Sequence, residues 1–298
     1  MIISHPCRNG KLFIAFRKKL CYTFRMIIEE LALAKLNLTL GVLYKREDGY
    51  HALDTVMQTV SLFDRVFIEK SRTVEVHVTG MTLPQENTMY QAAKLYKEAT
   101  GCGAKIRCEK RIPAEAGLGG GSADAAAVLR GLQRQHRMAD DKTLREIALK
   151  VGADVPFCLV GGTCRCEGVG EILTPFPLGK RLWFVIAKPK EGVSTRELFY
   201  RLPLPRPRVQ TLSAVAALAK GDLSSLAPLM KNVLEPAAIE LVPEIGTLKQ
   251  KLLDAGAIAA QMTGSGSAVF GLFESEEAAN AALPAVSDAA FSTVCYSL

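Results

Sequence analysis

The sequence predicts a mixed α and β fold from residue 26 onward, because strand-like and helix-like patterns succeed one another along the chain. Residues 36–40 alternate strictly between apolar and polar, which predicts a half-buried strand with one apolar face. β-branched residues gather at 56–68 and 74–78 and predict further strands. Residues 87–99 place apolar side chains three or four positions apart, which indicates a helix. Periodicity alone establishes the mixed class and no finer architecture.

The first strand is expected to begin at Met26, where the sequence reads Met-Ile-Ile-Glu-Glu. The charged stretch 44–51 separates residues 36–40 from the next strand and contains Asp48-Gly49, a pair that is typical of turns. The N-terminal part of the fold is therefore expected to read as strand, charged turn and strand.

Helices become prominent after residue 110. A Gly-rich stretch at 117–121 opens a long Ala-rich helix, and residues 143–151 carry an apolar stripe that predicts a second helix ending at Gly152. A short apolar strand is expected at 182–187. Beyond it the sequence predicts mostly helices, and then a second glycine cluster within 257–273.

Prolines mark two interruptions of this pattern. Pro203, Pro205 and Pro207 indicate a loop, and a bunching of Pro and Gly near 175–182 indicates a change of domain. We therefore expect an N-terminal domain over residues 26–179 and a C-terminal domain over residues 180–298.

The positive charge of the chain is concentrated in its first 25 residues. The 298 residues contain 37 Lys and Arg against 30 Asp and Glu, and residues 1–25 hold six of the basic residues and no acidic one. The remaining 31 basic residues almost balance the 30 acidic ones, which weakens any interpretation as a nucleic-acid or membrane-surface binder. The leader itself is open to three interpretations: a start site that belongs at Met26 rather than Met1, a transit peptide, or a surface-binding arm.

Cysteine usage and hydropathy favour a cytosolic enzyme. None of the eight cysteines forms a CxxC pair, and Cys164-Arg-Cys166, the closest pair, has no His nearby to complete a zinc site. Free, reduced cysteines packed as small apolar residues are expected. No run of about 18 apolar residues occurs, so the sequence predicts no membrane span.

The most informative segment runs from Pro113 to Ala123. Four glycines within residues 117–121 remove Cβ atoms, so that several backbone N–H groups can converge on one point. Ser122 is expected to cap the helix that follows, and such a helix N-terminus attracts an anion. The pattern is neither a Walker A loop nor a Rossmann GxGxxG motif, and the alternative is a flexible surface loop or a tight junction. We expect phosphate binding by Pro113, Ala114, Glu115, Ala116, Gly117, Leu118, Gly119, Gly120, Gly121, Ser122 and Ala123.

This segment resembles the second motif of the GHMP kinases (galactokinase, homoserine, mevalonate and phosphomevalonate kinases), which cradles ATP. Residues 34–38 (Ala-Lys-Leu-Asn-Leu) resemble the first motif, 152–157 (Gly-Ala-Asp-Val-Pro-Phe) the catalytic segment, and 263–270 the third motif. The resemblance extends from about residue 31 to residue 273. It departs at Leu33, where the family usually has Pro, and no chemical consequence is expected.

The resemblance implies an α+β, two-domain GHMP kinase fold, with an N-terminal half like ribosomal protein S5 domain 2 and a ferredoxin-like C-terminal half. The triple glycine and Asp48-Gly49-Tyr50-His51 resemble the branch that acts on a cytidine diphosphate-linked methylerythritol. That branch implies ATP-dependent phosphorylation of its 2-hydroxyl, with Mg²⁺, in the non-mevalonate isoprenoid pathway; a homoserine or mevalonate-type kinase is the alternative. It further implies a small-molecule substrate, no nucleic acid or membrane partner, a monomer or weak homodimer, and a bacterial cytoplasmic location, or a plastid one if the leader is a transit peptide.

The resemblance also implies roles for individual residues. Asp154 would be the catalytic base, although an Asp two residues before a Pro is by local sequence a helix cap. Lys35, by local sequence a solvated residue at the strand edge, would pair with Asp154 and the acceptor hydroxyl. Asn37 follows two residues later on the same face and would contact the erythritol part or the acceptor oxygen.

The cytidine end of the substrate is assigned in the same way. Tyr50 would stack on the base, His51 would supply hydrogen bonds, and Phe199 would form the opposite wall of the stack, unless it is an ordinary aromatic residue of an amphipathic helix. Thr195, Gly264, Ser265 and Gly266 would contact the substrate phosphates. Metal ligands are not assigned, and Asp124 is expected to face protein donors or a metal.

Overall fold

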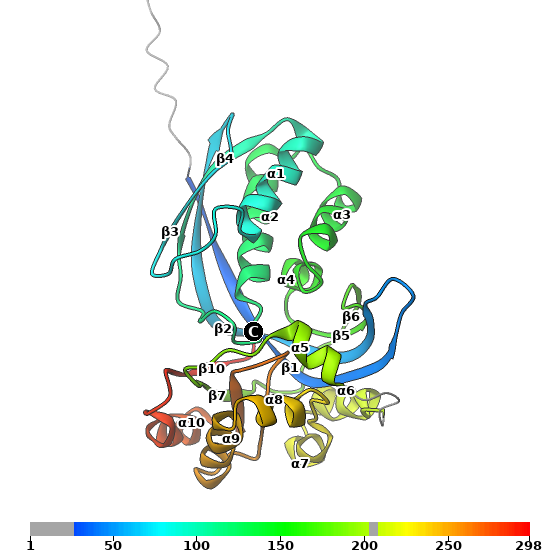
Figure 1. Cartoon of the computed structure of the whole chain (residues 1–298), viewed down its shortest axis with the longest axis vertical. Coiled ribbons are helices and arrows are strands. Elements are labelled where there is room, and N and C mark those ends of the chain that lie inside the picture. Colours follow the sequence, from blue (N-terminus) through cyan, green and yellow to red (C-terminus); the bar gives the residue numbers. More distant parts are fainter. Residues whose placement is uncertain (1–26, 203–207) are drawn as a thin grey trace, which may run out of the picture.

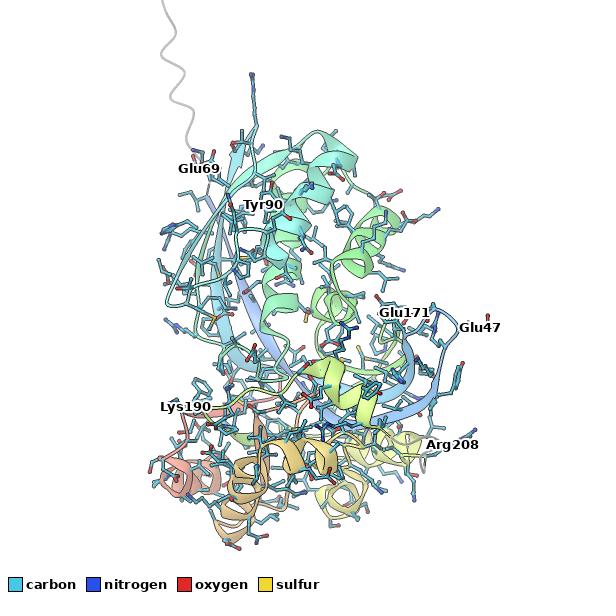
Figure 2. All side chains as sticks on the ribbon, in the orientation of Figure 1. Glu47, Glu69, Tyr90, Glu171, Lys190 and Arg208 are labelled. Atoms are coloured by element: carbon cyan, nitrogen blue, oxygen red, sulfur yellow. The ribbon has the colours of Figure 1, made fainter. Side chains whose placement is uncertain are left out.

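The computed structural model describes residues 27–202 and 208–298. The expectations for the leader and for the loop with three prolines therefore lie outside the described residues. Figure 1 shows an upper unit and a lower unit, with β1 reaching from one to the other. In Figure 2 the side chains of Glu47, in the turn after β1, and Glu171, between β5 and β6, lie on the same side of the molecule.

The upper unit is a six-stranded sheet with helices on one face. The strand order is β3-β4-β2-β5-β6, and β1 pairs antiparallel with β2 over most of its length. Four helices cover that face (Figure 1), and their apolar side chains build a core of mostly Ala, Val and Leu. The strands are β1 Ile27–Lys45, β2 His51–Ser71, β3 Glu75–Thr79, β4 Gly103–Glu109, β5 Thr163–Gly168 and β6 Ile172–Pro175, and the helices are α1 Thr88–Thr100, α2 Gly120–His136, α3 Asp141–Val151 and α4 Val155–Val160.

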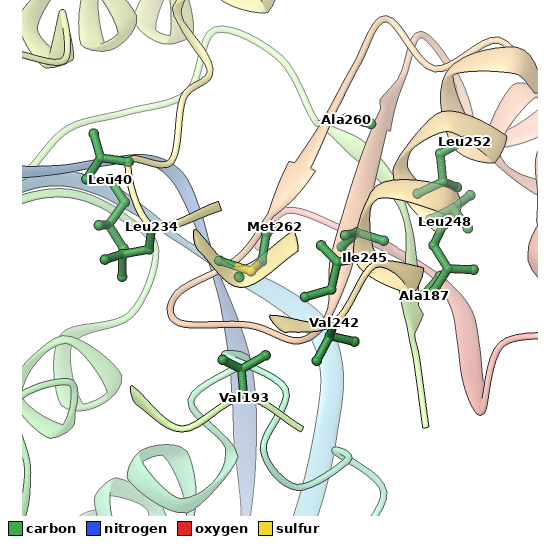
Figure 3. Packing of buried hydrophobic residues seen from close by; sticks show 14 of the residues in the cluster. Leu40, Ala187, Val193, Leu234, Val242, Ile245, Leu248, Leu252, Ala260 and Met262 are labelled. Carbon is green, nitrogen blue, oxygen red and sulfur yellow. The ribbon is translucent and has the colours of Figure 1, made fainter. Parts of the chain in front are cut away.

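The lower unit is a four-stranded antiparallel sheet in the order β10-β7-β9-β8. Helix α9 packs on it through Ile245, Leu248 and Leu252, and Val242, between α8 and α9, belongs to the same core (Figure 3). The strands are β7 Trp183–Lys188, β8 Ala259–Met262, β9 Val269–Phe273 and β10 Phe291–Tyr296, and the helices are α5 Thr195–Arg201, α6 Thr211–Lys220, α7 Leu223–Leu226, α8 Glu235–Leu241, α9 Glu244–Asp254 and α10 Glu276–Ala282, with 3-10 turns at Ala227–Leu229 and Leu283–Val286. The two sheets are antiparallel except where β3 pairs parallel with β4, and their helices are segregated from the strands, which confirms the expected α+β class.

The half-buried strand expected at 36–40 is wrong, because these residues are buried on both faces. Leu36 and Leu38 pack into the core that joins the two units, together with Phe184 and Phe270 of the lower sheet. The opposite, polar face of β1 is covered as well, since Asn37 meets the loop after β8. An alternating strand is half-buried only when one face meets water, and here the second face forms the floor of a cavity.

Asn and Asp side chains cap two helices of the upper unit, whereas the Ser122 cap expected for α2 is absent. Asn87 caps α1 and Asp140 caps α3 through side-chain hydrogen bonds, as Asx residues commonly do. Ser122 does not cap α2: that helix begins at Gly120, and Gly119, with φ of 69°, occupies the N-cap position. The left-handed backbone of Gly119 starts the helix earlier than a Ser cap would, so Ser122 lies in the first turn.

Candidate active site

A cavity of about 960 Å³ lies between the two units. Its walls come from β1, the β1–β2 turn, the glycine loop at 117–121, α5 and the loop after β8. Among the expected site residues, the cavity is lined by Lys35, Asn37, Tyr50, His51, Gly117, Gly119, Ser122, Asp154, Thr195, Phe199, Gly264 and Ser265.

Lys35 and Asp154 meet at the polar end of this cavity. Lys35 is only 4% exposed, and its Nζ lies 3.3 Å from Oδ2 of Asp154, which is 30% exposed. The Lys35 ammonium also donates to Oδ1 of Asn37 at 2.6 Å. A buried ammonium thus holds a partly solvated carboxylate at the cavity wall, where the carboxylate can accept a proton from a bound hydroxyl group.

Asp154 stands at the N-cap position of α4 but does not act as a cap. No side-chain hydrogen bond to the helix backbone is present in the described part of the chain, and its φ and ψ of −84° and −11° are helical rather than extended. Pro156 in the first turn removes one of the N–H groups that a cap would serve. The carboxylate is therefore available to face Lys35 instead of the helix.

Asn37 is held from both sides. Its Nδ2 donates to Oγ1 of Thr55 at 2.9 Å, and its backbone N–H donates to Oγ1 of Thr263 at 3.0 Å. Its Oδ1 accepts from Lys35, so the side chain has one fixed orientation. This network orients the Lys35 ammonium before any ligand arrives.

The glycine loop rests directly on Lys35. The backbone N–H of Lys35 donates to the carbonyl of Leu118 at 2.9 Å. A Cβ atom at Gly119 would lie 2.9 Å from Cγ of Lys35, and Gly117 and Gly119 both have positive φ. Larger residues would push the loop away from the ammonium, so glycine is required here by the close approach as well as by the backbone.

The N-terminus of α2, at Gly120, lies next to the contact between Gly119 and Lys35. Among the described residues, the backbone N–H groups of Gly120, Gly121 and Ser122 have no protein acceptor, and Gly119 provides no side-chain cap. The helix has 17 residues, so its N-terminal dipole is well developed. Uncapped N–H groups at a helix start form a binding site for an anion such as phosphate.

The remaining residues of the segment expected to bind phosphate do not line the cavity with their side chains. The side chains of Ala116, Leu118 and Ala123 are buried in the apolar cores. Gly120 packs against Ile112, and Gly121 lies near Thr88. These five, together with Pro113, Ala114 and Glu115, are not among the described residues that line the cavity.

The loop after β8 closes the cavity from the lower unit. Ser265 Oγ and Thr195 Oγ1, which belong to different elements, lie 2.6 Å apart. Asn232 Nδ2 donates to the carbonyls of Met262 and Gly264, both at 2.8 Å, and so fixes the backbone of this loop. Gly266 does not line the cavity. The sequence shows Asn232 only as part of the family-like pattern Asn232-x-Leu234-Glu235 and assigns it no role, because its two carbonyl partners lie 30 and 32 residues away.

Aromatic side chains form a second part of the cavity wall, the aromatic end. The rings of His51 and Phe199 stack with centroids 4.7 Å apart and an angle of 25° between planes. Tyr50, which is expected to stack on the base opposite Phe199, is 62% exposed and lines the same cavity. Burial and the charge of Lys45 lower the pKa of His51, which favours the neutral imidazole at pH 7. Lys45 and Arg196 also line this end and were missed as isolated surface cations.

The remaining sequence expectations concern metals, thiols and membranes. In residues 27–202 and 208–298 no group of three or more His, Cys, Asp or Glu side chains could hold a metal ion. Cys164 and Cys166 are free and buried in β5, where burial raises the pKa of the Cys164 thiol to about 11. Within the same residues, no helix combines the length and the apolar character that crossing a membrane requires.

Comparisons with known proteins agree with this geometry. The family model for the GHMP kinases N terminal domain matches residues 87–162, and the model for the GHMP kinases C terminal region matches residues 214–292. A protein of Alkaliphilus metalliredigens named 4-diphosphocytidyl-2-C-methyl-D-erythritol kinase is 42% identical over 250 residues, covering 81% of this chain and 86% of that protein. A protein of the same name from Pelotomaculum thermopropionicum is 43% identical over 263 residues, covering 85% and 92%.

Solved structures give the same grouping. A crystal structure of 4-(cytidine 5'-diphospho)-2C-methyl-D-erythritol kinase superposes with a TM-score of 0.79 at 38% identity, covering 91% of this chain and 99% of that chain. A homoserine kinase from Cytophaga hutchinsonii superposes with a TM-score of 0.74 at 24% identity, covering 93% and 96%. The second similarity concerns the fold alone.

Proposed function

The chain belongs to the GHMP kinases, in the branch whose members are named 4-diphosphocytidyl-2-C-methyl-D-erythritol kinase, and we propose that it phosphorylates that compound with ATP in the non-mevalonate isoprenoid pathway. The phosphoryl group goes to the 2-hydroxyl, giving the 2-phosphate and ADP. The observation that carries this proposal is the Lys35–Asp154 pair beside the uncapped N-terminus of α2.

Asp154 is the proposed base. Its Oδ atoms accept the proton of the 2-hydroxyl as the hydroxyl oxygen attacks the γ-phosphorus of ATP, and the bond between that phosphorus and the bridging oxygen of ADP breaks. The proton ends on Asp154 and returns to solvent, to which the carboxylate is 30% exposed. Lys35 lowers the energy of the negative charge that develops on the attacking oxygen, since its ammonium is buried and fixed in orientation by Asn37.

The glycine loop is the proposed phosphate site. Gly117, Gly119 and Ser122 line the same cavity as Lys35. The N–H groups in the first turn of α2 lack protein acceptors and can donate to a phosphate group at the positive end of the helix dipole. Kinases act mainly by positioning and by stabilising charge, and this arrangement supplies both on one side of the cavity.

Mg²⁺ is proposed as part of the nucleotide substrate. Magnesium keeps several water ligands and is commonly bound through phosphate oxygens with one or two protein groups. The described residues contain no acidic cluster that would hold the ion by itself, so the triphosphate is the main ligand set in this proposal. When bound, the ion neutralises charge on the phosphate oxygens.

The aromatic end of the cavity is proposed to bind the cytidine diphosphate part of the acceptor. Tyr50, His51 and Phe199 present aromatic rings on which a pyrimidine can stack. A neutral His51 can both donate and accept a hydrogen bond at the polar edge of cytosine. Thr195, Gly264 and Ser265 lie between the aromatic end and Lys35, where hydroxyl and N–H groups would meet the diphosphate.

The proposal also covers the domain boundaries, the oligomeric state and the cellular location of the protein. We propose residues 26–179 as the ATP-binding domain and 180–298 as the substrate domain, supported by the end of the upper sheet at Pro175 and the start of the lower sheet at Trp183. A monomer or weak homodimer without nucleic-acid or membrane partners fits a cavity built within one chain. A cytoplasmic location is supported by the bacterial origin of the relatives.

The test is an assay of ADP release with ATP and Mg²⁺ and one acceptor at a time. The acceptors are 4-diphosphocytidyl-2-C-methyl-D-erythritol, the uncapped 2-C-methyl-D-erythritol, homoserine and mevalonate. We expect turnover with the first alone, and a ³¹P spectrum of the product that shows a new monoester at the 2-position. Turnover with homoserine or mevalonate, or none with the cytidyl compound, would refute the proposal.

A further inference from the structure

Three charged side chains are buried together behind the glycine loop, outside the cavity. Asp64 of β2 is 0% exposed, Asp124 of α2 is 1% exposed, and Lys110, which follows β4, has a side chain 4% exposed. The Lys110 ammonium contacts the Asp64 carboxylate and lies 2.6 Å from Oδ2 of Asp124. None of the three lines the cavity. Two carboxylates therefore share one buried ammonium.

Such a cluster needs an explanation beyond stability. Burial of charged groups is strongly unfavourable unless they are paired, and replacing a buried ion pair with apolar residues often leaves a protein equally stable. The thiol of Cys108 is the other titratable group in contact, and it lies 3.8 Å from Oδ1 of Asp124. Lys110 and Asp124 lie on the segments that enter and leave the glycine loop, and Asp64 binds the first of these segments, so their pairing can hold that loop in place.

The cluster joins the two ends of the glycine loop. Oδ1 of Asp64 accepts from the backbone N–H groups of Arg111 and Ile112, the latter at 2.8 Å, and these residues begin the segment that leads into the loop. Asp124 lies about one turn into α2, where the loop ends. Lys110 bridges the two carboxylates, so the start and the end of the loop are tied through one ammonium.

The ammonium also lies close to the first turn of α2. A Cβ atom at Gly120 would be 3.5 Å from Lys110 Nζ, which puts the positive charge behind the N–H groups of that turn. Asp124 alone would place a negative charge near the site of an incoming phosphate, and Lys110 offsets this charge. Burial raises the pKa of Asp124 to about 7, which further reduces the negative charge at neutral pH.

We propose that Asp64, Lys110 and Asp124 are positioning residues that hold the glycine loop in its phosphate-binding form and balance the charge behind it. Nucleotide affinity then depends on a cluster that does not touch the nucleotide. This inference rests on the proposed function, because it takes the loop to be the phosphate site.

The test is the affinity for ADP, measured by calorimetry, in variants of Asp124. Asp124→Leu keeps Lys110 paired with Asp64 but severs the link to α2, so the dissociation constant for ADP is expected to rise about tenfold or more. KM for ATP rises in parallel, while KM for the acceptor stays unchanged. Asp124→Asn retains an oxygen that accepts from Lys110 and is expected to bind ADP within about twofold of the wild type.

Asp140→Leu provides a matched control. Asp140 caps α3 through a 2.7 Å hydrogen bond to the N–H of Thr143, so its loss lowers stability without changing the glycine loop. We expect a lower melting temperature and unchanged ADP affinity. Should Asp124→Leu fail to fold, Asp124→Ala replaces it, since Ala suits the Ala-rich start of α2.

Two results would overturn the inference: wild-type ADP affinity in a folded Asp124→Leu or Asp124→Ala protein, or an equal loss of affinity in Asp124→Asn. A wild-type protein that does not bind ADP would instead count against the proposed function.

Discussion

The two ends of the cavity are built in different ways. At the polar end Lys35 is 4% and Asn37 1% exposed, and each is fixed by hydrogen bonds to its neighbours. At the aromatic end Tyr50 is 62% and Tyr200 91% exposed, and both side chains border the cavity from the rim. One end is part of the interior of the protein, whereas the other is part of its surface.

This difference separates two tasks. Proton transfer and charge stabilisation depend on groups held within a fraction of an ångström, which requires a rigid and buried setting. Recognition of a flat base requires contact area, which exposed rings supply without being fixed in advance. Substitutions at the polar end should therefore reduce kcat, and substitutions at the aromatic end should raise KM for the acceptor.

The largest effect is expected for Asp154→Asn. The amide keeps the shape of the side chain but cannot take the hydroxyl proton, so kcat should fall by about 10³. ADP binding should remain within about twofold of the wild type, because Asp154 does not belong to the glycine loop. Steady-state kinetics and calorimetry measure the two quantities.

Stability serves as the control for this substitution. Asp154 makes no capping hydrogen bond to α4 in the described structure, so the melting temperature should be nearly unchanged. A variant that keeps wild-type turnover would show that another group takes the proton. A large loss of ADP affinity would show that the polar end does not separate catalysis from nucleotide binding.

A smaller effect is expected for Tyr50→Ala. Loss of one stacking ring is worth about 1–3 kcal/mol per base, so KM for the cytidyl acceptor should rise about tenfold at unchanged kcat. Tyr44→Ala is the matched control, since Tyr44 is 59% exposed on the same hairpin but does not line the cavity. Equal kinetic effects of the two substitutions would remove Tyr50 from the acceptor site.

The sequence predicts those parts of the molecule that rest on local patterns. The helices at Thr88–Thr100 and Asp141–Val151 follow from their apolar stripes, the second also from Gly152 at its end, and the strand at Trp183–Lys188 follows from a short apolar run. The glycine loop is recognisable because four closely spaced glycines before an Ala-rich helix allow backbone conformations and close approaches that other residues do not. The α+β class depends on the family resemblance, because periodicity gives strands and helices but not their pairing.

Other features depend on contacts between distant segments and have no local pattern. Asp64, Lys110 and Asp124 lie far apart in sequence, and only the pairing of β2 with β4 and the packing of α2 bring them together. The burial of both faces of β1 depends on the lower unit in the same way. The stacking of Phe199 on His51 depends on where α5 docks. Tertiary packing determines each of these outcomes, and local propensity does not.

The last prediction concerns stability rather than activity. The melting temperature should depend on pH through the buried Asp124 but not through the exposed Tyr50. The pKa of Asp124 is raised from 3.8 to about 7 by burial, so the folded protein holds a proton that the unfolded chain releases. This group therefore favours the folded state most at low pH, and its contribution is lost as pH rises from about 4 to 7. Between the two pKa values this contribution falls by about 1.4 kcal/mol per pH unit. Relative to Asp124→Asn, which cannot titrate there, the wild type should therefore lose about 5 °C in melting temperature between pH 5 and pH 8. Scanning calorimetry of both proteins across that range measures the difference, and Tyr50→Ala, at the exposed end, should run parallel to the wild type. Parallel curves for the wild type and Asp124→Asn would mean that Asp124 is ionised throughout, and the charge balance behind the glycine loop would then rest on Lys110 alone.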